Sequence, residues 1–389
     1  MAKKILVIND EEPIREVTRM VLQQNHYDVV LACNGQEGIA AAKANLPDLI
    51  LLDIMMPGGM DGYDTCREFK KDPQIKDIPV IFLSSLTSPK DKIKGLETGG
   101  VDFINNIGDK GEFLARIETH LKIKSLTQAL MTTNQQLLDK QKSLDDDLKA
   151  AALIQRSFLP PPCFTLENFN IAWTCVPCNP VGGDSLNIMP LNEDKVACYM
   201  LDVSGHDVPS AMVTVSVSQY LHQQNTTHGA CLSPKEMMKA LDKEYPMERF
   251  DRYFTIFYMT LDLKQGQISY SSAGHPPAIW LKPNANFQLL SGCGTIIGIN
   301  EFGSGTYDQW DAKLENGDKL FLYTDGVTEY PNAKGELFGQ ERFIDLLEKN
   351  KKENLSKIIY IIQETLKDFG QENIPRDDIS MLGLEYTSK

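Results

Sequence analysis

The chain has few basic residues relative to its acidic ones, and it has no long apolar run. Of its 389 residues, 39 are Lys or Arg and 53 are Asp or Glu, which gives a net charge of −14. A nucleic-acid-binding protein normally presents a basic face, so we expect no nucleic-acid partner. No apolar run reaches the roughly 20 residues that a membrane-spanning helix needs, so we expect no membrane segment.

Cysteines are also sparse, and they are not arranged as metal ligands. The eight of them are scattered, several within apolar segments, as reduced and buried thiols are. Cys175-Val-Pro-Cys178 is a lone C-x-x-C pair, and without a second pair or a nearby histidine pair it does not predict a zinc site. The start Met1-Ala-Lys-Lys-Ile5 lacks the apolar core of a signal peptide. These features predict a cytoplasmic protein, and the length is sufficient for two or three domains.

Glycine and proline are absent between Glu112 and Leu159, which predicts a long helix. Apolar residues recur in it every seven positions, and a largely polar series lies four residues after the first four of them. The two series are Leu130, Leu137, Leu144, Ala151 and Phe158, and Asn134, Gln141, Leu148 and Gln155. In a coiled coil, residues at this spacing form the stripe, or seam, along which the helices meet. This seam favours a parallel coiled-coil dimer. We assign residues 123–160 to this linker and expect a homodimer; the alternative is a single helix that lies on one of the domains.

Before the linker, short apolar runs alternate with helical patterns. The runs are Lys4–Ile8, Asp28–Ala32, Leu49–Leu52, Pro79–Leu83 and Asp102–Ile104. Alternation of this kind predicts an α/β fold with a doubly wound, parallel, five-stranded sheet. Sites in such sheets gather at the carboxyl ends of the strands, where Asn9, Asp10, Asp53 and Ser84 fall. Two acids and a hydroxyl there suit a phosphoryl acceptor that is assisted by Mg²⁺.

The amino-acid sequences of these runs resemble those of a response-regulator receiver domain, which we place at residues 1–122. The likeness is carried by Ile5-Leu-Val-Ile-Asn-Asp-Glu11, Leu51-Leu-Asp-Ile-Met-Met-Pro57 and Asp61-Gly62. It implies that Asp53 accepts a phosphoryl group from a cognate histidine kinase and that Asp10 binds Mg²⁺. It also implies switch roles for Ser84 and Phe103.

Three departures favour an alternative, a receiver-shaped domain that only binds a partner. Asn9 stands where the family usually has a second Asp, and Gly58-Gly59 adds a residue to a loop. Asn106-Ile107 replaces the usual Lys-Pro pair. Because asparagine at position 106 cannot balance charge as lysine does, we expect Asp53 to be phosphorylated slowly or without the full switch.

After the linker, acidic residues occupy four places where an apolar strand pattern meets a loop. They are Asp184, Asp202, Asp325 and the pair Asp377-Asp378. An Asp beside Gly is usually a solvated turn residue. Four such places that converge on one rim would instead hold Mg²⁺ or Mn²⁺, which prefer oxygen ligands. Spacing alone leaves both interpretations open.

The surrounding motifs resemble the PP2C-type serine/threonine phosphatases of bacterial stress and sporulation signalling, the group of SpoIIE and RsbU. They are Val181-Gly-Gly-Asp184, Leu201-Asp-Val-Ser-Gly-His206, Ala273-Gly-His-Pro-Pro277, Leu322-Tyr-Thr-Asp-Gly-Val-Thr-Glu329 and Asp377-Asp-Ile-Ser380. Five motifs in order are far more specific than any one of them. The resemblance implies an α-β-β-α sandwich, which we place at residues 161–389, with the metal site at one edge.

The resemblance also implies roles for individual residues. Asp202 would bridge two Mn²⁺ or Mg²⁺ ions, helped by the Val203 carbonyl, with Asp184 on one ion. Asp325 and Asp377 would serve the other ion, and Asp378 would replace Asp377 or act behind it. His206 would protonate the leaving oxygen; hydrogen bonding within the loop is an equally good interpretation of both His206 and His275.

Two functions follow as hypotheses. The first is a receiver-controlled, metal-dependent phosphatase for phosphoserine or phosphothreonine, and the resemblance implies a STAS-type anti-anti-sigma protein as substrate. The second is a signalling scaffold with a degenerate receiver and weak or absent phosphatase activity. A DNA-binding response regulator is excluded because no DNA-binding output module is evident and the charge is acidic.

Overall fold

The computed structural model describes residues 2–57, 59–83, 89–105, 108–161, 166–227, 232–299, 306–371 and 375–387. The chain divides into two compact units, Met1–Lys142 and Ser143–Lys389. Among the helices in these ranges, none is both long enough and apolar enough to cross a membrane.

The first unit contains the predicted parallel sheet. Its strands are β1 (Lys4–Ile8), β2 (Asp28–Ala32), β3 (Leu49–Asp53), β4 (Val80–Leu83) and β5 (Asp102–Ile104). They pair in the order β2-β1-β3-β4-β5, and every pairing is parallel. The chain places β2 on one side of β1 and β3 to β5 on the other side, and this change of direction makes the sheet doubly wound. This part of the predicted fold is therefore confirmed.

Helices cover both faces of this sheet because each strand is apolar on both sides. They are α1 (Glu12–Gln24), α2 (Gly35–Asn45), α3 (Gly62–Lys71), α4 (Pro89–Glu97) and the start of α5 (Lys110–Arg156). One apolar cluster joins the sheet to α2 and α3, and another joins it to α1 and α5. Asn34 and Asp61 cap α2 and α3 by accepting the backbone N–H three residues later.

Helix α5 is the predicted linker helix, and its first turns belong to the core of the first unit. Phe113, Ile117 and Leu121 are buried there. Arg116 pairs with Asp102 on β5 at 2.9 Å. Beyond these turns the heptad leucines Leu130, Leu137 and Leu144 are 61%, 60% and 56% exposed, so the seam is uncovered in the single chain.

The second unit is built on two antiparallel sheets. One has the order β13-β10-β9-β8-β7 and the other β12-β11-β14-β15-β6. The strands are β6 (Phe169–Val176), β7 (Asp184–Pro190), β8 (Lys195–Val203), β9 (Phe254–Asp262), β10 (Gln267–Ala273), β11 (Ala278–Leu281), β12 (Gln288–Leu290), β13 (Trp310–Lys313), β14 (Lys319–Tyr323) and β15 (Ile379–Tyr386).

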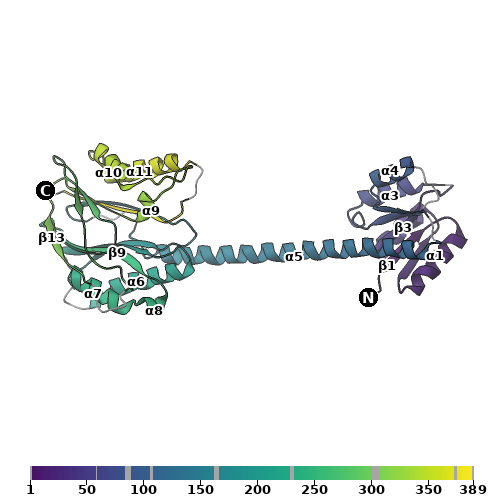
Figure 1. Ribbon diagram of the computed structural model, residues 1–389, viewed down its shortest axis with the longest axis horizontal. Helices are drawn as coiled ribbons and strands as arrows, with labels where there is room; N and C mark the ends of the chain where they lie inside the picture. Colours follow the sequence, from purple (N-terminus) through teal and green to yellow (C-terminus); the bar gives the residue numbers. More distant parts are fainter. Residues whose placement is uncertain are drawn as a thin grey trace. The chain divides into compact units, whose positions relative to one another are not determined.

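Figure 1 shows the two sheets between two layers of helices. An apolar cluster fills the space between the sheets. Helices α6 (Val208–Thr227) and α7 (Pro234–Glu244) pack on the outer face of one sheet, and α10 (Gln340–Lys349) and α11 (Leu355–Gly370) on the other. The predicted α-β-β-α sandwich is therefore confirmed.

Some elements were not expected from the sequence. Strands β7, β12 and β13 are at or next to the ends of the sheets, and β12 and β13 are three and four residues long. Edge strands need fewer β-branched residues than central ones, so they leave a weak pattern. Two single-turn helices, α8 (Met247–Phe250) and α9 (Asp325–Thr328), were also missed. Asp325 consequently starts a helix rather than ending a strand.

Candidate active site

Two predicted metal ligands, Asp184 and Asp202, lie directly opposite each other across adjacent strands. Asp184 is the first residue of β7 and is paired in register with Asp202 near the end of β8. Directly opposite residues of an antiparallel pair extend from the same face of the sheet. Leu186 and Met200 share this face and lie in the core between the sheets. Both carboxylates therefore point into the sandwich at its edge.

The second sheet brings the other acids to the same edge. Asp325 follows β14, and Asp377 and Asp378 precede β15. Thr324 connects the two sheets, because its Oγ1 donates to Asp184 Oδ2 at 2.8 Å and accepts from the backbone N–H of Ser380 at 3.1 Å. The edges that carry the acids are thus held together by a buried hydroxyl.

Asp377 and Asp378 have different surroundings. Both oxygens of Asp378 accept backbone N–H groups, from Cys178 at 2.8 Å and from Asp184 at 3.1 Å. Asp377 Oδ1 accepts from the backbone N–H of Asp378 at 2.8 Å. Oδ2 of Asp377 accepts no hydrogen bond from any described residue. Asp378 therefore holds the Asp184 loop in place, while Asp377 retains a free oxygen.

Burial and mutual repulsion disfavour the charged forms of these acids. Burial raises the pKa of Asp202 to about 8, and the carboxylates of Asp325 and Asp377 add to the effect. The pKa of Asp325 rises to about 6, again through burial and then through Asp377. Burial and Asp202 also raise the pKa of Asp184. An arrangement that repels its own charges is the one that divalent cations stabilise.

The donor set fits Mg²⁺ or Mn²⁺, since it consists of carboxylate oxygens. Among the described residues, no three acidic, histidine or cysteine side chains already surround a single point as a closed metal centre does. The carboxylates instead lie at the ends of strands in both sheets, with Asp184 and Asp378 buried.

The two glycines before Asp184 are required by close approaches. A Cβ at Gly183 would come within 2.4 Å of the Val203 carbonyl oxygen, and a Cβ at Gly182 within 2.3 Å of Asp378 Oδ2. The Val203 carbonyl, predicted as a ligand, therefore lies directly against the loop that carries Asp184.

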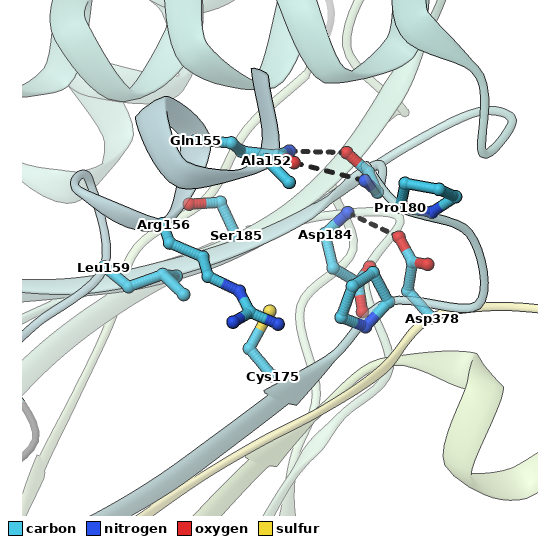
Figure 2. Close-up of a pocket in the computed structure, with 11 residues that line it drawn as sticks. Ala152, Gln155, Arg156, Leu159, Cys175, Pro180, Asp184, Ser185 and Asp378 are labelled. Atoms are coloured by element: carbon cyan, nitrogen blue, oxygen red, sulfur yellow. Dashed lines mark hydrogen bonds between the residues drawn. The ribbon is translucent and has the colours of Figure 1, made fainter. Parts of the chain in front are cut away.

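The C-terminal end of α5 is attached to this same loop. Gln155 donates from Nε2 to the Gly182 carbonyl at 2.6 Å and accepts at Oε1 from the Gly182 N–H at 3.2 Å. Figure 2 shows these two bonds beside the one from Asp184 to Asp378. A small pocket between α5 and the loop is lined by Arg156, Cys175 and Asp184 among others. The linker helix thus fixes the backbone two residues before a predicted ligand.

His206 is exposed in the loop after β8. Asn179 Nδ2 is 2.6 Å from His206 Nδ1 and donates to the His206 carbonyl at 3.0 Å. Asp207, next in the chain, caps α6 by accepting from Ser210, and it also pairs with Arg252 at 2.8 Å. The Asp207 side chain is thus held by the start of α6 and by Arg252.

His275, the histidine of the Ala-Gly-His-Pro-Pro motif, has different surroundings. It is 6% exposed, and burial lowers its pKa to about 3, so the ring is neutral. Its Nδ1 lies 2.8 Å from Thr255 Oγ1. A buried neutral imidazole here favours the structural interpretation of His275.

The receiver acids meet at the carboxyl end of the parallel sheet, as predicted from topology. Asn9 is buried, and its Nδ2 donates to Asp53 Oδ2 at 2.7 Å. Asp53 Oδ1 accepts from the backbone N–H of Met55 at 3.2 Å. Burial is the main cause that raises the pKa of Asp53 to about 6, and the nearby charges of Asp10 and Glu11 contribute to the rise. Asp10 and Asp53 still offer oxygens for one Mg²⁺, but Asn9 contributes a donor where an acid would attract the ion.

Two predicted switch positions, Ser84 and Asn106, lie outside the described residues. Phe103 is buried and stacks on Phe82 with ring centroids 5.2 Å apart.

Sequence reasoning missed four residues of the phosphatase edge: Gln155, Asn179, Thr255 and Thr324. Thr324 had a local signal, a hydroxyl immediately before a predicted ligand in a motif. The other three act across long sequence separations, so nothing near them in the chain indicates their partners.

The raised pKa values predict how stability depends on pH without metal. An Asp whose pKa is higher in the folded chain than in the unfolded chain binds more protons when folded, so the free energy of unfolding falls as pH rises. In chelator, thermal melting of the second unit should therefore occur at lower temperature at about pH 8 than at about pH 5. Asp202→Asn should reduce this dependence, and a wild-type melting temperature that rises over this interval would contradict the assignment.

Comparison with known proteins gives a family match for each of the two units. Residues 192–387 match the family described as Stage II sporulation protein E (SpoIIE), and residues 5–118 match the response regulator receiver domain. The response regulator PleD of Caulobacter vibrioides is 38% identical over 130 residues, which are 33% of this chain and 28% of PleD. The chain thus spans little more than a quarter of the length of the curated relatives it matches.

Two solved structures resemble the second unit. The SiaA-PP2C domain of Pseudomonas aeruginosa has a TM-score of 0.56 at 24% identity and covers 64% of this chain and 98% of that domain, which shows the fold. The RsbU and RsbW domains of a Mycobacterium tuberculosis protein have a TM-score of 0.47 at 22% identity and cover 57% of this chain and 60% of that one. With more than half of its length matched by one family, the chain belongs to the SpoIIE family, as a response regulator whose receiver domain precedes a PP2C-type phosphatase domain.

Proposed function

We propose that this chain is a metal-dependent phosphatase for phosphoserine or phosphothreonine in a protein. The supporting observation is the set of acids that both sheets bring to one edge of the sandwich, with pKa values raised by burial and by one another. All the predicted carboxylates are present at this edge. A protein that acts only as a scaffold has no need of a cluster that destabilises itself.

In this proposal Asp202 lies between two cation positions. Asp184 and the Val203 carbonyl complete one of them, and Asp325 and Asp377 the other. Asp378 supports the ligands without binding a cation itself, because both of its oxygens accept backbone N–H groups. Two bound Mn²⁺ or Mg²⁺ ions would supply a water of lowered pKa and would neutralise the phosphoryl oxygens. The protein would hold the ligand oxygens of these acids in place through Thr324, Asp378 and the Gly182-Gly183 loop.

His206 is the proposed donor of a proton to the leaving serine or threonine oxygen. Asn179 Nδ2 lies 2.6 Å from its Nδ1 and also donates to its backbone carbonyl, so the ring is oriented through Nδ1. The exposed position of His206 suits a group that must reach a protein substrate. Asn179 is then a positioning residue for the ring.

The proposed substrate is a phosphorylated STAS-type anti-anti-sigma protein in the cytoplasm, an assignment that rests on the family resemblance. The proposed architecture is a receiver at residues 1–122, a linker at 123–160 and a phosphatase at 161–389. A cognate histidine kinase would act on Asp53. The alternative, a scaffold with a degenerate receiver, is favoured by one observation in the first unit, the Asn9 amide that binds Asp53.

Phosphatase activity toward an aryl phosphate or a phosphopeptide should require Mn²⁺ or Mg²⁺. Asp202→Asn or Asp325→Asn should reduce turnover by about 100-fold or more, because each leaves a cation without a charged ligand in a site built on electrostatic stabilisation. Circular dichroism should show that both variants fold. As a control, Asp194→Asn changes a partly exposed acid, paired with Lys264, in the turn between β7 and β8, at the other end of these strands from Asp184 and Asp202. Undiminished turnover in chelator, or in both variants, would refute the metal mechanism.

The exposed heptad leucines predict a homodimer through residues 123–158. Light scattering should give a dimer for the wild type and a monomer for Leu137→Asp with Leu144→Asp, because charge in the seam opposes burial of apolar side chains. Gln135→Asp with Gln136→Asp adds the same charge outside the seam and should leave the dimer intact. A wild type that is monomeric at micromolar concentration would disprove the coiled coil.

The receiver should respond weakly to a small phosphodonor. Asn106 is neutral where a lysine would balance the acyl phosphate, and the Asn9 amide already binds Asp53. Phosphatase rates with and without donor should therefore change little, and alike, in the wild type and Asp53→Ala, while Asn106→Lys should gain a response. A large donor effect in the wild type that Asp53→Ala abolishes would show that the receiver is competent.

A further inference from the structure

We infer that Arg252 is a positioning residue for His206, because it holds the loop that carries this histidine through contacts with Asp207 and Ser210. The inference rests on the proposed function, in which His206 gives a proton to the leaving serine or threonine oxygen. It predicts that Arg252 is important for substrates that need this proton and unimportant for substrates that do not.

The loop at residues 204–207 carries His206 and follows directly after β8. It turns at Gly205, where φ is +90°, a backbone conformation that favours glycine. Its start is fixed to the chain just before β9: the Ser204 N–H donates to the Tyr253 carbonyl at 2.9 Å, and the Tyr253 N–H donates to Ser204 Oγ at 3.2 Å. Beyond Gly205 the chain leaves the sheet, so the position of His206 depends on contacts with side chains.

Arg252 reaches this loop from the segment before β9. Its Nη2 donates to Asp207 Oδ2 at 2.8 Å, and its Nε donates to Ser210 Oγ at 3.1 Å. Its Nη1 donates to the backbone carbonyl of Asp251 at 2.7 Å. Because the guanidinium group is planar and rigid, these three donors fix one residue of the loop and one residue of α6 relative to the start of β9.

Ser210 lies at the centre of these contacts and is fully buried. Its Oγ is 2.8 Å from the Ser204 carbonyl oxygen and 2.7 Å from Asp207 Oδ1, and it accepts from Arg252. The Ser210 N–H also donates to Asp207 Oδ1, at 3.1 Å. A Cβ on Gly205 would lie 3.0 Å from Ser210 Oγ, so the turn packs directly against this hydroxyl. Both ends of the loop therefore contact one buried group that Arg252 holds.

The ring of His206 is placed by a second contact, with Asn179. Its Nδ2 lies 2.6 Å from His206 Nδ1 and donates to the His206 carbonyl at 3.0 Å. Asn179 thus binds both the ring and the backbone of the histidine. It can direct the ring toward a substrate as long as the backbone stays in place, and the contacts of Arg252 hold the backbone at the next residue, Asp207.

A nearby arginine shows what an ordinary surface pair looks like in this chain. The Arg249 side chain is 65% exposed and pairs with Glu244 at 3.5 Å, whereas the Arg252 side chain is 22% exposed. An exposed pair of the first kind contributes little to stability. Within the described ranges, Arg249 forms no hydrogen bond or ion pair with the loop at residues 204–207. It therefore provides a control of the same charge, three positions away in the sequence.

The test compares two substrates that differ in their need for a proton. When the bond from phosphorus to a serine oxygen breaks, that oxygen leaves as an alkoxide unless it receives a proton, whereas p-nitrophenyl phosphate releases a stable phenolate. Arg252→Met, which removes the donors, should lower kcat for a phosphoserine peptide about tenfold or more and kcat for p-nitrophenyl phosphate less than about twofold. Arg249→Met should leave both rates unchanged.

Two further measurements on the full chain test the route of the effect. Asp207→Asn should show the same difference between substrates. The double variant Asp207→Asn with Arg252→Met should be little slower on the phosphopeptide than the slower single variant, since residues that act as one unit are not additive. In chelator, backbone hydrogen exchange at residues 203–209 should become faster in Arg252→Met but not in Arg249→Met.

Equal losses on the two substrates would overturn the inference, because Arg252 would then support the fold or the acidic edge in general. An unchanged phosphopeptide rate in Arg252→Met would overturn it too. Melting temperatures show whether each variant folds, and Asp207→Asn carries the same comparison if Arg252→Met does not. His206→Ala should show the same difference between substrates, and equal losses there would refute the proton donor and the inference with it. A wild type without metal-dependent turnover of either substrate would instead refute the proposed function.

Discussion

The repulsion among buried carboxylates is the constraint around which the second unit is organised. Asp202, Asp184 and Asp325 all have raised pKa values because burial and their neighbours disfavour charge. A fold that holds such groups together must restrain them from outside the cluster. Thr324 does so by a hydrogen bond between the sheets, and Asp378 does so by accepting two backbone N–H groups. The two sheets and their connecting loops thus hold the mutually repelling acids together from outside the cluster.

The linker helix takes part in this restraint. Gln155 makes a reciprocal pair of hydrogen bonds with Gly182, next to a glycine whose Cβ would strike the Val203 carbonyl. A backbone packed this closely has little freedom, so a small displacement or rotation of α5 would change the position of the Asp184 loop. Helix α5 is one uninterrupted helix from Lys110 to Arg156, and Gln155 lies in its last turn.

The sequence predicted the sheets because their central strands are continuous apolar runs, and it predicted the acids because five motifs surround them. It did not predict β7, whose Asp-Ser-Leu-Asn-Ile-Met-Pro sequence needs an apolar face only toward the core. Nor did it distinguish Asp377 from Asp378, because adjacent carboxylates differ only in which backbone groups approach them. The contacts of Gln155 and Thr255 were likewise beyond sequence reasoning, since each partner lies at least 20 residues away and depends on the assembled fold.

The two units deal with carboxylate charge in opposite ways. The phosphatase edge keeps its predicted acids, and Asp184 lies directly opposite Asp202 on the neighbouring strand. In the receiver, the position beside the phosphoacceptor is an amide, and its Nδ2 is directed at Asp53 from 2.7 Å. Such a donor gives Asp53 part of the stabilisation that a cation or a lysine would give, but it cannot leave when a phosphoryl group arrives. The buried Asn9 amide is therefore a fixed neutral donor beside Asp53, where a second acid would have added charge for a cation.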